Sequence, residues 1–128
     1  MRIKKRFTEG SASPYDNLVF TTRKSEIRNP DGSVAFMNEQ VQVPESWSQV
    51  ATDIIAQKYF RKAGVPEYTE PVAEEGVPAW LWRSEPAAGT AFAGESDSRQ
   101  VFDRLAGCWT YWGWKEGYFE DEDSAKAY

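Results

Sequence analysis

The densest run of prolines and glycines lies between residues 64 and 95, and it limits where long regular structure can form. The segment contains Pro66, Pro71, Pro78 and Pro86 together with Gly64, Gly76, Gly89 and Gly94. Proline fixes φ and lacks an N–H donor, and glycine adds backbone freedom, so both interrupt helices and central strands. We therefore expect 64–95 to be loop-rich, with Trp80-Leu81-Trp82 as its apolar anchor.

Residues 1–45 are predicted to form strands and turns. Apolar and polar side chains alternate around Phe20, which is typical of a half-buried strand. Asn29-Pro30-Asp31-Gly32 is strong turn sequence, since proline presets φ and glycine accepts a positive φ. We expect a hairpin centred on Pro30-Asp31, followed by a short third strand at Val41 and Val43 that ends at Pro44.

A helix is predicted over 46–63. Ser46 and Gln49 have the spacing of a capping box, and Gly64 is placed to end the helix. The expected buried face is apolar at helical spacing and consists of Trp47, Val50, Ala51, Ile54, Ile55 and Tyr59.

Helices are also expected over 97–128. A stripe of Val101, Phe102, Leu105, Trp109 and Trp112 predicts a helix from about Asp97 to Trp112, with Ser96 or Ser98 as its cap and Gly113 breaking it. Asp121 has the character of an N-cap for a third helix. An isolated helix of about eight residues is only marginally stable in water, so we expect the chain to be truncated inside this third helix.

The predicted fold class is α+β: a hairpin and short strands, then two to three helices and a long Pro/Gly-rich loop.

Composition excludes several functional classes. The chain has 128 residues, which fits one domain, and a net charge of −5, which argues against a general nucleic-acid binder. No apolar run approaches the roughly 20 residues that span a bilayer. Cys108 is the only cysteine, so no internal disulfide can form, which is consistent with a reducing compartment. We expect a cytoplasmic protein without nucleic-acid or membrane partners.

The residue inventory leaves little for catalysis. The chain has no histidine, so it lacks the commonest general base and the commonest metal-binding side chain. Cys108 lies late in a predicted helix and is interpreted as an ordinary packed or half-exposed thiol. The acidic run Glu120 to Asp123 lies at a helix start, where carboxylates are stabilising. We therefore assign no catalytic, cofactor-binding or metal-binding residue.

The most unusual feature is an aromatic cluster late in the chain. We interpret it as core or as an interface, and the candidate interface residues are Trp109, Trp112, Trp114, Tyr118 and Phe119. A stacking platform for a base or sugar is the alternative, but it would need a groove of basic or polar groups, and only Arg99, Arg104 and Lys115 are close in sequence.

Three segments in order carry a resemblance to a known family. They run from Asn29 to Phe36 (NPDGSVAF), from Val43 to Pro66 (with SWSQ and KYF), and from Arg99 to Phe119 (RQVFDRLAG and WGWKEGYF). Together they resemble the N-terminal region of the adenosylcobalamin-dependent (class II) ribonucleotide reductases, along nearly the whole chain.

The resemblance implies a single N-terminal domain over 1–128 that precedes, and lacks, the α/β barrel of a larger oxidoreductase. In that family a cysteine thiyl radical, generated with adenosylcobalamin, converts ribonucleotides to deoxyribonucleotides, and we take the substrate to be a ribonucleoside diphosphate. The barrel site needs at least three cysteines, so this chain alone is predicted to be inactive and to bind no cofactor.

The expected partner is the catalytic barrel, in the same chain or in a partner chain. The alternative from another class is a stand-alone module whose aromatic surface binds a ligand or a protein.

Overall fold

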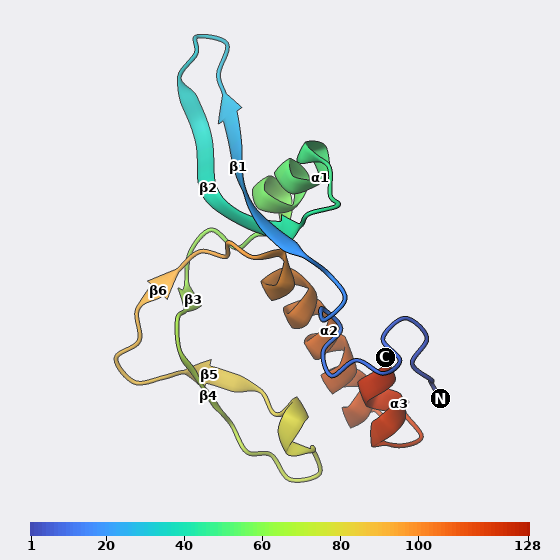
Figure 1. Ribbon diagram of the computed structural model, residues 1–128. Coiled ribbons are helices and arrows are strands. Elements are labelled where there is room, and N and C mark those ends of the chain that lie inside the picture. Colours follow the sequence, from blue (N-terminus) through green and yellow to red (C-terminus); the bar gives the residue numbers. More distant parts are fainter. The chain divides into compact units, whose positions relative to one another are not determined.

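The computed structural model describes residues 1–128 and has an α+β fold (Figure 1). Its strands are β1 (Phe20–Arg28), β2 (Val34–Pro44), β3 (Val65–Pro66), β4 (Thr69–Pro71), β5 (Ser84–Pro86) and β6 (Phe92–Ala93). Its helices are α1 (Gln49–Ile54), a π-helical turn η1 (Ile55–Tyr59), a 3-10 turn η2 (Ala79–Leu81), α2 (Ser98–Lys115) and α3 (Glu122–Ala127).

The chain forms two compact units, each assembled from separate stretches of sequence. Unit 1 comprises residues 1–16, 66–91 and 103–128, and unit 2 comprises residues 17–65 and 92–102. Helix α2 therefore contributes its first five residues to unit 2 and the remainder to unit 1. This division does not test whether residues 1–128 fold on their own as one domain. The single-domain expectation therefore stays a prediction.

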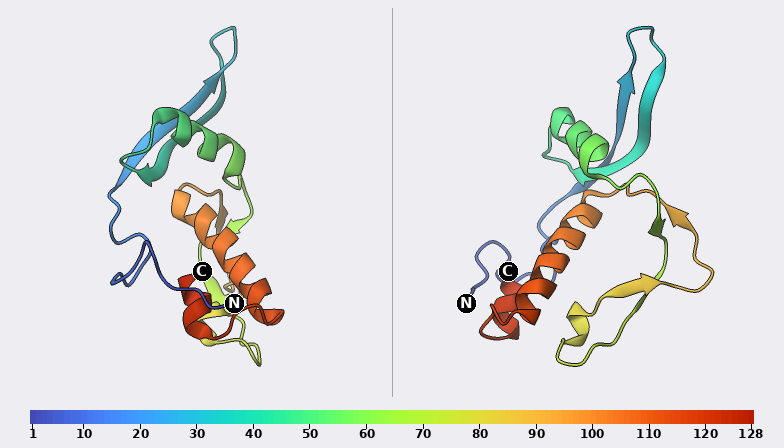
Figure 2. Two further views of the ribbon diagram at one scale, coloured as in Figure 1. Left: turned by 90° about the vertical axis from the view of Figure 1, so that its right-hand side faces the viewer. Right: turned by 180° about the vertical axis from the view of Figure 1, so that it is seen from behind.

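Unit 2 is built on the antiparallel hairpin of β1 and β2. Asn29 accepts a backbone hydrogen bond from Gly32, whose φ of 86° requires glycine, and this confirms the predicted turn. The ladder runs from Arg28 opposite Val34 down to Phe20 opposite Pro44, with two register shifts. The distal half of the hairpin extends past α1 (Figure 2).

The predicted third strand is wrong, because the return strand does not stop after Phe36. Strand β2 continues through Val41 and Val43, which pair with Arg23 and Thr21 and are fully buried. An irregularity in the ladder between Arg23 and Ser25 lets the hairpin bend and stay paired, which is the usual consequence of a bulge.

The helix predicted over 46–63 is shorter and starts later. Ser48, not Ser46, is the N-cap: its Oγ accepts a hydrogen bond from the backbone N–H of Ala51 at 3.1 Å. The N–H of Trp47 instead closes a turn onto the carbonyl of Pro44. The helix ends as a π-turn, because the N–H of Phe60 reaches back five residues to Ile55 and Phe60 itself is extended.

The predicted buried face of this helix is also partly wrong. The structure buries Thr52, Ile55 and Ala56 and leaves Val50 and Ile54 exposed. The reason is polar anchoring to the hairpin. Thr52 lies 3.2 Å from an Arg23 guanidinium nitrogen, and Ser25 donates a hydrogen bond to Asp53 at 2.7 Å, so the Thr52 side turns inward.

The 64–95 segment contains short strands rather than a long regular element. In unit 1, β4 and β5 pair antiparallel, and Val77 and Leu81 are buried around η2. Trp82 donates its indole N–H to the carbonyl of Val77 at 2.8 Å, while Trp80 stays exposed and donates to Glu122. Strand β3 pairs with β6. Leu81 is thus the buried member of the expected Trp80-Leu81-Trp82 anchor.

Helix α2 begins with a capping box that sequence reading did not identify. Asp97 accepts a hydrogen bond from the Arg99 N–H at 2.9 Å, and the Gln100 side chain accepts from the Asp97 N–H at 3.0 Å. Neither Ser96 nor Ser98 provides this cap.

The predicted break at Gly113 is wrong, since α2 continues to Lys115. A Cβ on Gly113 would lie 2.7 Å from a ring carbon of Phe119. The glycine therefore makes room for an aromatic ring without ending the helix.

Helix α3 begins where the sequence predicts it. Asp121 is the N-cap and accepts hydrogen bonds from Ser124, which lower the pKa of the Asp121 carboxyl. The N-terminus of the chain pairs with the segment that enters α3. The Glu120 N–H donates to the Met1 carbonyl at 2.9 Å, and the Ile3 N–H donates to Ser124 Oγ at 3.2 Å.

Glu74 joins the loop before η2 to α2 within unit 1. Its carboxylate accepts hydrogen bonds from the Tyr111 hydroxyl, at 2.7 Å, and from the Lys115 ammonium, and Arg83 lies 3.7 Å away. The Lys115 and Tyr111 hydrogen bonds lower the pKa of Glu74, and the acceptor carboxylate raises the pKa of Tyr111. Only about a fifth of the Glu74 side chain is exposed.

We predict that Gly107→Ala stabilises the protein and that Gly113→Ala does not. Both glycines lie inside α2, where alanine is favoured by about 0.5–1 kcal/mol per residue. Nothing lies within 4 Å of a Cβ at Gly107, whereas Phe119 obstructs one at Gly113. Urea unfolding of the two variants measures the difference, with Gly107→Ala as the control for helix propensity. An equal gain in both would contradict the Phe119 packing.

We predict that Glu74 stabilises unit 1 at neutral pH and that acid removes this contribution. Because folding lowers its pKa, the contribution is present above the carboxyl's ordinary value near 4.5 and is lost as the pH falls through the folded-state pKa. Glu74→Gln should therefore lower the thermal midpoint at pH 7 and change it little at pH 3. The neighbouring Glu75→Gln, at an exposed side chain, should have little effect at either pH. A Glu74→Gln effect that is the same at both pH values would refute the linkage.

Candidate docking surface

No group of three or more His, Cys, Asp or Glu side chains comes together in a way that could hold a metal ion. Cys108 is exposed on α2 and unpaired. No helix combines the length and the apolar character needed to cross a membrane. The candidate site therefore rests on the aromatic residues.

In the unit 1 part of α2, Leu105, Trp109 and Trp112 form an apolar strip, which we call the α2 aromatic face. These residues are three and four positions apart, so their side chains project from one side of the helix. Trp109 is 50% exposed and Trp112 is 59% exposed, while Leu105 is half-buried. Two half-exposed tryptophans at this spacing form an exposed apolar surface.

Two small residues of the same helix, beside this face, are buried. Thr110 and Gly113 are buried, and the Thr110 hydroxyl donates to the Ala106 carbonyl at 2.7 Å, so it needs no other partner. Small residues at these two positions let neighbouring chain pack close to the helix.

Tyr118 is the third exposed aromatic residue of the predicted set, with 61% of its surface accessible. Its backbone is fixed, because its N–H donates to the Gly113 carbonyl at 2.8 Å and its own carbonyl accepts from the Met1 ammonium group. Gly117, with a φ of 69°, provides the left-handed turn that ends α2 before Tyr118. The Tyr118 ring is thus held at the surface by a well-anchored backbone.

Trp114 and Phe119 have internal contacts instead. Trp114 is half-buried and donates its indole N–H to the Gly76 carbonyl at 2.7 Å. Phe119 is half-buried, packs against Gly113 and lies 5.6 Å from the Tyr128 ring. Both side chains help to hold unit 1 together, so the structure separates the five predicted residues into three exposed and two packed ones.

Four further aromatic residues of unit 1 are exposed: Phe7, Tyr68, Trp80 and Tyr128. Trp80 is 43% exposed, donates to Glu122 at 3.0 Å and carries the Lys126 ammonium 5.4 Å from its ring centre. Tyr128 is 53% exposed. Trp80 precedes a leucine in a Trp-Leu-Trp run, and nothing in that local pattern indicates which of the three residues is buried.

Comparisons with known proteins identify relatives of the chain. A family model described as class II vitamin B12-dependent ribonucleotide reductase matches residues 21–128. A vitamin B12-dependent ribonucleotide reductase from Bradyrhizobium diazoefficiens is 52% identical over 136 residues, and one from Agrobacterium fabrum is 51% identical over the same length. A third, from Rhodopirellula baltica, is 26% identical over 117 residues, which include 91% of this chain.

The matches cover very different shares of this chain and of its relatives. The first two include 100% of this chain but only 11% of each relative, so the chain spans about a ninth of their length. The three resembling segments, from Asn29 to Phe119, all lie inside the region that the family model matches. The chain belongs to the class II vitamin B12-dependent ribonucleotide reductase family and corresponds to an N-terminal segment of those enzymes.

Proposed function

We propose that this chain is a non-catalytic component of an adenosylcobalamin-dependent ribonucleoside-diphosphate reductase and that it docks on the catalytic barrel through exposed aromatic side chains. The observation that carries the proposal is the α2 aromatic face. Trp109 and Trp112 expose half or more of their surfaces on one side of α2. Tryptophans are strongly enriched among the residues that dominate protein interfaces.

The relatives' coverage supports the same proposal. If about nine-tenths of a working enzyme lies outside a segment like this one, a surface that is open in the segment has a large protein available to cover it. Tyr118 extends the proposed contact, while Trp114 and Phe119 support it from inside unit 1. The partner is the catalytic barrel, either in the same polypeptide or in a separate one.

The chemistry of ribonucleotide reduction is assigned to the partner. The chain has one cysteine, Cys108, and a thiyl-radical reaction that also uses a cysteine pair needs more than one. It also has no histidine, which is the side chain that most often ligates a transition metal. We therefore place adenosylcobalamin on the barrel. The acidic chain and its lone thiol suit a cytoplasmic enzyme.

The proposal is tested by adding the chain to a class II reductase that lacks its own N-terminal segment and assaying cobalamin-dependent reduction. We expect the mixture to be more active than the truncated reductase, and the chain alone to be inactive. Changing Trp109 and Trp112 together to alanine should weaken binding at least tenfold, since an interface tryptophan often contributes more than 1 kcal/mol. Analytical ultracentrifugation or titration calorimetry measures the affinity.

Tyr68→Ala is the matched control, because Tyr68 is a 71% exposed aromatic residue of unit 1 outside the α2 aromatic face. Binding should survive this substitution. If the chain neither binds nor activates a reductase from a close relative, docking is refuted. A stand-alone module that binds another protein or a ligand then becomes the better explanation of the exposed tryptophans.

A further inference from the structure

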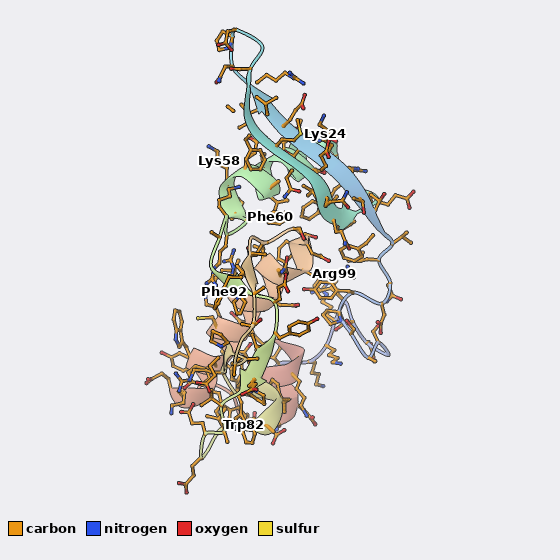
Figure 3. The ribbon with its side chains drawn as sticks, turned by 90° about the vertical axis from the view of Figure 1, so that its left-hand side faces the viewer. Lys24, Lys58, Phe60, Trp82, Phe92 and Arg99 are labelled. Atoms are coloured by element: carbon orange, nitrogen blue, oxygen red, sulfur yellow. The ribbon has the colours of Figure 1, made fainter.

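A groove of about 520 Å³ lies within unit 2, beside the hairpin. Its walls come from three segments: β2 contributes Phe36 and Asn38, the end of the helix contributes Phe60, and the chain before α2 contributes Gly94 and Ser96. Figure 3 shows Phe60 and Lys58 where the helix ends. The volume is within the range of about 300–1,000 Å³ that is usual for small-molecule sites.

The close approach of two backbones shapes one wall. A Cβ on Gly94 would lie 2.8 Å from the Lys62 carbonyl oxygen, so only glycine fits there. The next residue, Glu95, donates its N–H to the Arg61 carbonyl and accepts from the Arg61 N–H, each at a distance of 2.8–2.9 Å. This wall is therefore held in place before any ligand binds.

Three cations lie together at this place: Lys58, Arg61 and Lys62. None of them has a carboxylate within ion-pair distance, although the chain has 20 acidic residues against 15 basic ones. Lys62 is exposed, but partial desolvation by the surrounding groups and the nearby Lys58 lower its pKa, which is the expected response of a cation without a counter-charge.

Apolar and cationic groups meet inside the groove. The Lys62 ammonium lies 4.4 Å from the centre of the Phe36 ring and donates to the Ala56 carbonyl. Arg61 also lines the groove and is exposed. The groove contains two carboxylates: Glu95 is buried and bonded to the Arg61 backbone, and Glu39 is exposed at the rim.

We propose that this groove binds a small organic anion, with an apolar body against Phe36 and Phe60 and a carboxylate or phosphate group against Lys62 and Arg61. An anion here supplies the counter-charge that the cluster lacks, and the two rings supply apolar contact. The groove lies in unit 2 and uses none of the α2 aromatic face, so this proposal stands independently of the docking proposal.

The test is an NMR titration of the isotope-labelled chain with phenyl phosphate and, separately, with benzoate. We expect saturable shifts of the amide signals of Gly94, Glu95 and Ser96 with at least one of the two probes, and the stronger binder identifies the anionic group. Inorganic phosphate carries only the anionic group, and benzyl alcohol carries only the apolar ring. Each should therefore bind at least tenfold more weakly. No saturable shift with either probe, or equal binding of inorganic phosphate, would overturn the proposal.

Substitutions test which side chains make the site. Lys62→Gln should weaken binding of the better probe about tenfold or more, the usual magnitude for loss of a hydrogen bond to a charged group. Arg61→Gln, at an exposed side chain, tests the site again if Lys62→Gln disturbs folding. Lys5→Gln is the control, because it makes the same charge change at an exposed residue of unit 1. Equal weakening by Lys5→Gln and by both groove variants would mean that only net charge matters, and the site would be rejected.

Discussion

The reciprocal hydrogen bonds between Arg61 and Glu95 are the constraint on which unit 2 depends. They connect two stretches of chain that are more than 30 residues apart, and the Glu95 carboxylate is almost completely buried in the process. A buried carboxylate is costly unless it is hydrogen-bonded, so this contact tolerates little change on either side. Gly94 adds a steric requirement at the same point, and Gln42 continues the connection by donating its N–H to the Ser96 carbonyl at 2.8 Å.

Polar connections of this kind matter because the apolar core is small. Nine apolar residues are buried, and most of them are valine, alanine or isoleucine. Phe60 is the only aromatic residue among them. Unit 1 likewise relies on hydrogen bonds between distant segments, including Tyr111 to Glu74 and Trp114 to Gly76. Most of the aromatic surface therefore lies outside the core, where it is available for contact with something else.

Because the apolar core is small, each unit has a separate surface that is open to a partner or ligand. The α2 aromatic face belongs mainly to unit 1 and is apolar, which suits a large protein partner. The groove of unit 2 combines two rings with cations that lack a carboxylate partner, which suits a small anion. We propose that a segment representing 11% of its relatives' length contributes docking through the first surface and ligand recognition through the second.

Local chemistry in the sequence was sufficient to predict the features that depend on neighbouring residues. The turn at Asn29 to Gly32, the N-cap at Asp121 and the helix through Trp109 all follow from short-range hydrogen bonding and periodicity. The family was also predictable, since three ordered segments carry it. The α+β class followed from the same local elements.

Only the tertiary structure decided which surfaces are buried. The α1 helix has apolar residues on more than one side, and hydrogen bonds from Arg23 and Ser25 of the hairpin selected the side that contains Thr52. Gly113 has the sequence character of a helix breaker, yet the ring of Phe119 makes it a packing position inside α2. Such outcomes depend on partners that are distant in sequence, and local propensity contains no information about them.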